Sequence, residues 1–169
     1  KSGKLYLMPI FNKICVIGLG YIGLPTAAVF ARSGIEVIGV DVNPNVVDMI
    51  NTGKAHIVEA DLDELLHSVI ENGSLKASLQ AEEADAYLIA VPTPFKGDHE
   101  PDLTYVEEAV RSIAPHVKEG SLLVLESTVP PGATEKMVEW LEEERPDLKE
   151  KGGAGTAYYA AHCPERVLP

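Results

Sequence analysis

A short apolar run that stops at a glycine constrains the fold of this chain more than any other feature. Ile14–Ile17 is continuous and apolar, as is typical of a strand buried on both faces of a sheet. Apolar residues then follow helical spacing over Tyr21–Ser33, and Gly34 provides a C-terminal stop. Ile35–Val40 is again β-branched and apolar, and it is followed by Asp41. This order of strand, helix and strand predicts a βαβ unit with a right-handed crossover.

The same alternation continues toward the C-terminus. Asn43 is a candidate N-cap for a helix that begins at Pro44. The charged and then glycine-rich segment Glu142–Gly155 is expected to be an exposed loop. We expect helices over 44–51, 61–71, 104–114 and 134–144, a buried strand over 86–91, and further strands over 122–126 and 157–162. The predicted fold class is therefore α/β, a Rossmann-like doubly wound parallel sheet with helices on both faces.

The turn after the first strand has the glycine spacing of a dinucleotide-binding turn. Gly18, Gly20 and Gly23 form a G-x-G-x-x-G pattern between the strand and the helix. We expect Gly18 to permit the tight turn and Gly20 to let the backbone approach a pyrophosphate. Gly23 would let the helix pack closely on the strand. The N–H groups and the dipole at the helix start would then hold the phosphates.

The acid at the end of the second strand indicates which cofactor is bound. Asp41 lies where a carboxylate accepts hydrogen bonds from the adenosine ribose hydroxyls and repels a 2′-phosphate. No Arg or Lys occurs between Asp41 and Asn51 to reverse that preference, so NAD is favoured over NADP. The alternative is that the glycines only make a tight turn and that Asp41 caps a loop.

Length, charge and cysteine content exclude several classes of protein. The 169 residues suit one domain, and the net charge of −12 disfavours nucleic acid and anionic membranes as partners. No apolar run approaches the roughly 18 residues of a membrane span. Two cysteines make no disulfide framework, which indicates a cytoplasmic protein, and the five histidines have no metal-ligand spacing, so no metal site is expected. Residues 1–7 are expected to be an added tail, which leaves 8–169 as the domain.

Five short segments, taken together, carry a family resemblance. They are Gly18–Pro25, Asp41–Asn43, Val91–Pro94, Glu126–Gly132 and Cys163–Val167. In this order and at this spacing they resemble the UDP-glucose/UDP-mannosaminuronate dehydrogenases, the nucleotide-sugar 6-dehydrogenase family. The resemblance covers nearly everything from Lys13 onward. It implies an NAD-binding Rossmann domain without the family's central helical and C-terminal substrate domains.

Two segments further resemble one branch of that family. Phe95–Asp102 and Cys163–Pro169 are similar to the branch that acts on UDP-N-acetylmannosamine. The same domain of a UDP-glucose or UDP-N-acetylglucosamine 6-dehydrogenase stays open as an alternative. A stand-alone NAD-binding module, acting as a sensor or an interaction domain, is the alternative from a different class.

The resemblance also implies a reaction. Family enzymes oxidise the C6 alcohol of a UDP-sugar to a carboxylate and consume two NAD⁺ per turnover. A cysteine thiolate captures the aldehyde, and water hydrolyses the resulting thioester. The segment that holds this cysteine has no match here, and Cys163 matches a different position. The chain alone is therefore expected to bind NAD without forming NADH, whereas the intact enzyme is expected to be a homo-oligomer.

Cofactor contacts are implied by residue-by-residue matching to the family. Tyr21, Ile22 and Asp41 match its contacts to NAD, and Thr93 and Thr134 match its contacts near the nicotinamide half. All five follow the carboxyl ends of expected strands, where open α/β sheets bind their ligands.

Matching also implies residues for hydrolysis and for substrate binding. Glu165 matches a general base, and Thr128 matches a threonine that positions the hydrolytic water. Arg166 and Val167 match substrate contacts. In the absence of the resemblance, Thr128 would be read equally well as a loop cap, and Glu165 with Arg166 as a solvated ion pair.

Overall fold

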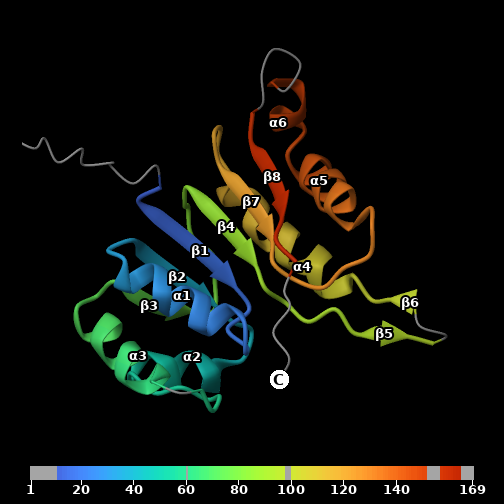
Figure 1. Ribbon diagram of the computed structural model, residues 1–169. Helices are drawn as coiled ribbons and strands as arrows, with labels where there is room; N and C mark the ends of the chain where they lie inside the picture. Colours follow the sequence, from blue (N-terminus) through green and yellow to red (C-terminus); the bar gives the residue numbers. More distant parts are fainter. Residues whose placement is uncertain (1–10, 60, 98–99, 152–156, 165–169) are drawn as a thin grey trace, which may run out of the picture.

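Six parallel strands form the main sheet of the computed structural model, which describes residues 11–59, 61–97, 100–151 and 157–164. The strands are β1 (Lys13–Ile17), β2 (Glu36–Val40), β3 (Leu75–Ser78), β4 (Ala86–Ile89), β7 (Leu122–Leu125) and β8 (Tyr159–His162). Their order is β3-β2-β1-β4-β7-β8 (Figure 1). The strand order reverses between β1 and β4, which is the position where doubly wound sheets bind ligands.

Helices cover both faces of this sheet. They are α1 (Gly23–Arg32), α2 (Pro44–Asn51), α3 (Leu62–Glu71), α4 (Thr104–Ile113), α5 (Ala133–Glu144) and α6 (Pro146–Lys151), with a 3₁₀ turn η1 (Ala114–His116). Helices α1, α2 and α3 lie over β1, β2 and β3 on one face, and α4 and α5 pack on the other face (Figure 1). The predicted Rossmann-like fold is confirmed. Among the described residues, no helix is long and apolar enough to cross a membrane.

Alternation of side chains along β1 divides the core into two halves. Ile14 and Val16 pack with α1, α2 and α3, whereas Cys15 and Ile17 pack with α4 and α5. Strands buried on both faces read as continuous apolar runs, which is why β1 was recognisable from the sequence. Burial raises the pKa of the Cys15 thiol to about 11, so this cysteine serves as a core residue rather than a nucleophile.

The expected helix boundaries follow from local capping. The Asn43 side chain accepts a hydrogen bond from the Asn45 N–H at 3.0 Å, which confirms Asn43 as the N-cap of α2. Gly34 has φ +88° and donates its N–H to the Ala31 carbonyl, so it ends α1 as expected. Asp61, expected inside a helix, is instead the N-cap of α3, with φ +61°.

The prediction of an exposed loop over Glu142–Gly155 is wrong for most of that segment. Within Glu142–Gly155, α5 continues to Glu144 and α6 occupies Pro146–Lys151, whereas 152–156 lie outside the described residues. The reason is that Leu148 is buried in the core. Arg145 also donates to the carbonyls at the end of α4 and η1, at 2.9 Å to Ala114 and 2.6 Å to Val117.

Two further elements were not expected from the sequence. The short hairpin of β5 (Phe95–Lys96) and β6 (Glu100–Pro101) projects beyond the sheet (Figure 1). Strand β3 at the edge of the sheet alternates buried and more exposed positions, and its sequence Leu-Lys-Ala-Ser contains no β-branched residue. Both elements therefore lack the apolar, β-branched composition that identifies a strand.

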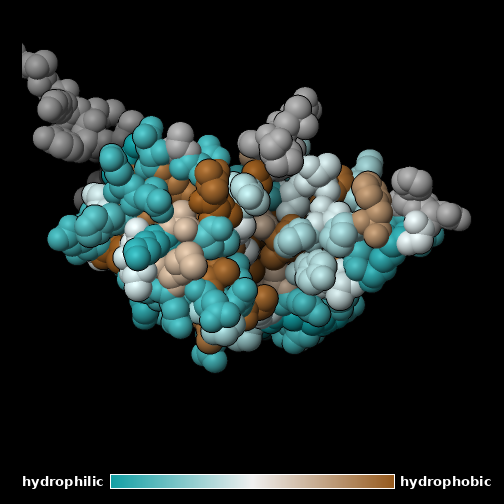
Figure 2. Space-filling view, turned by 90° about the horizontal axis from the view of Figure 1, so that it is seen from below, coloured by the Kyte–Doolittle hydropathy of each residue, from teal (hydrophilic) through white to brown (hydrophobic). Residues whose placement is uncertain are grey.

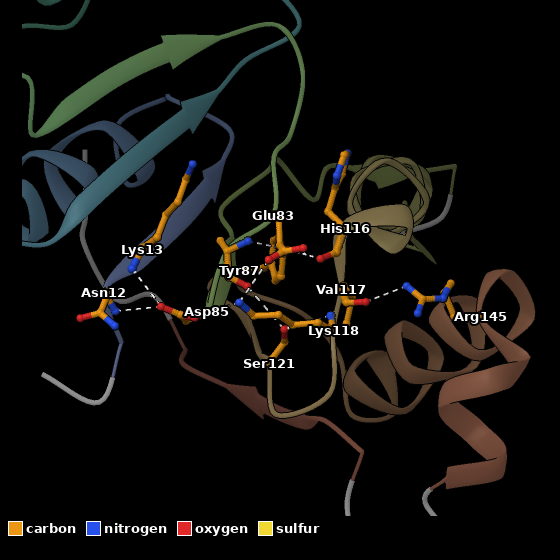
Figure 3. A network of polar contacts seen from close by, with 11 residues as sticks. Asn12, Lys13, Glu83, Asp85, Tyr87, His116, Val117, Lys118, Ser121 and Arg145 are labelled. Atoms are coloured by element: carbon orange, nitrogen blue, oxygen red, sulfur yellow. Dashed lines mark hydrogen bonds and ion pairs between the residues drawn. The ribbon is translucent and has the colours of Figure 1, made fainter.

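A polar network holds the loops at the amino edge of the sheet (Figure 3). The Asp85 carboxylate accepts hydrogen bonds from the backbone N–H groups of Asn12 and Lys13, at 2.8 and 3.0 Å. Lys118 lies 3.3 Å from the other Asp85 oxygen. These contacts hold the pKa of Asp85 below its usual range, the Asn12 bond having the largest effect. Asp85 thus joins the starts of β1 and β4 to the loop before β7.

The Tyr87 hydroxyl stabilises the same edge from inside the core (Figure 3). It accepts from the Ala84 N–H at 3.0 Å and donates to the His116 carbonyl at 2.7 Å. The Tyr87 side chain is fully buried, and burial raises its pKa to about 12. A polar group in such a position contributes to stability mainly because its partners would otherwise be buried without a hydrogen bond.

We predict that Tyr87→Phe lowers the free energy of unfolding by about 1–3 kcal/mol, because the Ala84 N–H and the His116 carbonyl lose their partner. Urea unfolding followed by circular dichroism measures the change. Tyr159→Phe, at an exposed tyrosine on β8, is the control and should change stability by less than about 0.5 kcal/mol. Equal stability of the two variants would contradict the role given to the Tyr87 hydroxyl.

Candidate functional site

The loops at the carboxyl edge of the sheet enclose a cavity of about 410 Å³ between β1 and its neighbours. Its lining comes from four loops, those after β1, β2, β4 and β7, and consists of Gly18, Gly20, Tyr21, Ile22, Asp41, Ala90–Thr93 and Glu126–Thr128. We call this cavity the crevice. Figure 2 looks onto this edge of the molecule, where apolar residues gather near the middle between hydrophilic ones. The crevice lies at the point where the strand order reverses.

The glycines of the first turn differ in what a side chain would meet. Gly18 has φ +89°, and a Cβ there would lie 2.6 Å from the Ala90 carbonyl oxygen. A Cβ on Gly23 would overlap the Gly18 carbonyl oxygen, so α1 packs directly against the turn. Gly20 has nothing within 4 Å of its Cβ position and lines the crevice. The space in front of Gly20 is therefore available to a ligand.

Helix α1 points its N-terminus at the crevice. Its N-cap, Ile22, provides no side-chain cap, and no acidic residue occurs in the first turn. Tyr21 is exposed, and Tyr21 and Ile22 both line the crevice. A helix start with this composition favours an external anion, because the helix dipole and the first N–H groups are not satisfied by an acid of its own.

Asp41 is oriented by the backbone on both sides of its carboxylate. One oxygen accepts from the Leu19 N–H at 3.0 Å, and the other accepts from the Asn43 N–H at 2.9 Å. The first bond fixes Asp41 against the glycine turn. Because each carboxylate oxygen can accept more than one hydrogen bond, Asp41 can still bind ribose hydroxyls in the crevice.

Gly39 is a structural residue that the sequence interpretation missed. A Cβ at Gly39, inside β2, would lie 2.7 Å from Cδ2 of Leu19. Leu19 is fully buried, and its backbone N–H is the group that orients Asp41. A glycine inside an apolar strand is the signal that could have shown this close approach.

Side-chain hydrogen bonds join the loops after β4 and β7. Ser127, which is buried, donates its hydroxyl to the Val91 carbonyl at 2.9 Å. The Thr93 hydroxyl donates to the Thr128 carbonyl at 2.8 Å. Ser127 and Glu126 line the crevice although neither was named from the sequence as a site residue. Their position directly after a buried strand was the available signal.

The predicted site residues divide into three groups. Seven of them line the crevice, namely Gly18, Gly20, Tyr21, Ile22, Asp41, Thr93 and Thr128. Gly23 lies beneath the turn, and Thr134 lies in the first turn of α5 but outside the crevice lining. Glu165, Arg166 and Val167 lie outside the described residues. The described part of the chain contains no cluster of three or more His, Cys, Asp or Glu side chains able to hold a metal ion.

Comparison with known proteins identifies the domain. Residues 12–169 match the model of the UDP-glucose/GDP-mannose dehydrogenase family, NAD binding domain. The chain belongs to this family. The matched family domain is an NAD-binding domain, and the first two glycines of the turn and Asp41 line the crevice of this chain.

Individual relatives agree with this assignment. The UDP-N-acetyl-D-mannosamine dehydrogenase of Campylobacter jejuni is 61% identical over 162 residues, which are 94% of this chain and 40% of that protein. The enzyme of the same name from Escherichia coli K12 is also 61% identical, over 94% of this chain and 38% of that protein. The chain thus spans about two fifths of the curated relatives. A solved structure of UDP-D-ManNAc dehydrogenase from Pyrococcus horikoshii has a TM-score of 0.83 at 44% identity, covering 93% of this chain and 37% of that one.

We predict that alanine at two glycines of the turn affects two different properties, cofactor binding at Gly20 and stability at Gly23. Gly20→Ala should keep the stability of the parent chain but weaken NAD⁺ binding by about tenfold or more, because its Cβ enters the crevice. Gly23→Ala should lower the free energy of unfolding by about 3 kcal/mol, because its Cβ meets backbone atoms. Thermal unfolding and calorimetric titration measure the two quantities. Normal NAD⁺ affinity in Gly20→Ala would argue against a pyrophosphate at this turn.

Proposed function

We propose that this chain is the NAD-binding domain of a UDP-N-acetylmannosamine 6-dehydrogenase. The observation that carries the proposal is the crevice, which combines a glycine turn, an uncapped helix start and an oriented acid at the switch point of the sheet. Support for the sugar comes from the relatives, since those at 61% identity carry this name. The segment Phe95–Asp102 also resembles that branch of the family.

The arrangement of groups in the crevice supports one orientation of NAD⁺. The pyrophosphate would meet the N–H groups between Gly18 and Gly23, and the adenosine ribose would donate to Asp41. Since the dinucleotide crosses the switch point, its nicotinamide half would lie over the loops after β4 and β7, near Thr93 and Thr128. Thr134, at the start of α5, would contact the same half.

The cofactor and the residues of this chain would have separate roles in the reaction. NAD⁺ supplies the hydride acceptor, and the chain binds and orients it. Thr128 would position the water that hydrolyses the thioester, and Glu165 would act as the general base. Arg166 and Val167 would contact the UDP-sugar. These roles rest on the matches of these residues to the family. As part of the same proposal, the intact enzyme would be a homo-oligomer located in the cytoplasm.

Asp41 provides the test of cofactor choice. We predict that the chain binds NAD⁺ clearly more tightly than NADP⁺, and that Asp41→Ala weakens NAD⁺ binding roughly 10- to 100-fold, because hydrogen bonds to a charged group are lost. The preference over NADP⁺ should shrink in the same variant, because the charge that repels a 2′-phosphate is removed. Calorimetric titration of each protein with both dinucleotides measures these constants.

Asp48→Ala is the matched control, since it removes an equal charge from an exposed position of α2 outside the crevice lining. Its NAD⁺ affinity should equal that of the parent chain. An Asp41→Ala variant that binds NAD⁺ as well as Asp48→Ala does would show that Asp41 has no role in ribose recognition.

The choice of sugar is tested on a full-length enzyme, one that contains this domain and is as long as the relatives. We predict NADH formation with UDP-N-acetylmannosamine at a kcat/KM at least about 100-fold above that with UDP-glucose or UDP-N-acetylglucosamine, a difference of about 3 kcal/mol in transition-state binding. Absorbance at the NADH band follows each reaction. Preferential oxidation of UDP-glucose would overturn the assignment to this branch while leaving the family intact.

A further inference from the structure

Two hydrogen bonds, Ser127 to Val91 and Thr93 to Thr128, join the loops after β4 and β7. A third hydrogen bond connects these loops to the last strand, β8. His162, the final residue of β8, places its Nε2 3.0 Å from the Ser127 carbonyl oxygen. A carbonyl oxygen can only accept a hydrogen bond, so Nε2 carries the proton in this contact. The bond from His162 therefore holds the peptide that joins Ser127 to Thr128.

Both ends of this bond are fixed by other contacts. His162 is paired in register with Leu125 of β7, and the next residue, Cys163, donates its N–H to the Leu125 carbonyl at 3.0 Å. At the other end, the Ser127 side chain is buried and bonded to the loop after β4 through the Val91 carbonyl.

The three bonds form one continuous set along one side of the crevice. His162 holds the Ser127 carbonyl, Ser127 holds Val91, and Thr93 returns from the loop after β4 to the Thr128 carbonyl. We call this set the crevice clamp. Val91, Thr93, Ser127 and Thr128 all line the crevice, on the side away from Asp41 along the sheet order.

We propose that His162 is a positioning residue for the nicotinamide end of the crevice. Its Nε2–H fixes the Ser127–Thr128 peptide, and through the crevice clamp it fixes the loop after β4, before the cofactor arrives. The inference rests on the proposed function of the crevice as an NAD site. His162 is not among the residues that line the crevice, so the effect assigned to it acts through these loops.

The position of the crevice clamp predicts which half of NAD⁺ depends on His162. A loop that must be ordered during binding lowers affinity for the group that touches it. The nicotinamide half, with its ribose, would lie over the clamped loops, whereas the ADP part would lie on the glycine turn and Asp41. Loss of the His162 bond should therefore weaken NAD⁺ binding and leave ADP binding unchanged.

The test compares His162→Leu with His162→Gln, whose side-chain amide can donate to the same carbonyl. We expect His162→Leu to weaken NAD⁺ binding by about five- to tenfold, as for loss of one hydrogen bond, with ADP binding changed by less than about twofold. His162→Gln should recover most of the NAD⁺ affinity. His67→Leu, at an exposed histidine on α3 outside the crevice lining, is the control.

Amide hydrogen exchange provides a readout that does not depend on binding. Without cofactor, the amides of 127–129 should exchange faster in His162→Leu than in the parent chain or in His162→Gln. Unchanged exchange in His162→Leu, or equal weakening of NAD⁺ and ADP binding, would overturn the positioning role. Failure of the parent chain to bind NAD⁺, with faster exchange in His162→Leu, would instead contradict the proposed function and leave the clamp as a property of the fold.

Discussion

Helix α1 lies directly against the turn that precedes it because Gly23 has no side chain. Any Cβ there would overlap the Gly18 carbonyl oxygen, and Gly18 itself lies against the Ala90 carbonyl with φ +89°. This contact directs the start of α1 at the crevice and brings the ends of β1 and β4 together. The geometry of the site therefore depends on two positions where any side chain would displace backbone atoms.

The remaining parts of the crevice are held relative to that turn. The Leu19 N–H, within the turn, orients Asp41, and Gly39 leaves the space into which the Leu19 side chain fits. On the opposite side, Ser127 and Thr93 bond across the loops that follow β4 and β7. The crevice is thus built from backbone groups and short side chains whose positions are set before a ligand binds, which reduces the ordering cost of binding.

The sequence was most informative where burial imposes a simple pattern. Strands β1, β4 and β7 are continuous apolar runs, and α2 has an Asn-Pro start, so these elements were predicted close to their observed bounds. The glycine turn was recognisable by its spacing, and Gly18 and Gly23 occupy positions where a side chain would meet backbone atoms. Strand β3 was missed because an edge strand needs few apolar residues. Helix α6 was missed because five of its six residues are polar or charged or proline, although Leu148 is buried.

Contacts between distant loops were beyond the reach of the sequence. Thr93 and Thr128 were named individually, but the bond between them joins residues 35 positions apart and depends on the register of β4 and β7. His162 was considered only as a metal ligand, since nothing local shows that β8 brings it to the Ser127 carbonyl. Such bonds follow from the strand order, which local patterns do not specify.

The crystal structure of this chain with NAD⁺ tests the central claim most directly. The account predicts the pyrophosphate against the turn from Gly18 to Gly23, the adenosine ribose within hydrogen-bond distance of Asp41, and the nicotinamide half over the loops after β4 and β7. Density for the cofactor outside the crevice, or an adenosine ribose placed away from Asp41, would contradict it.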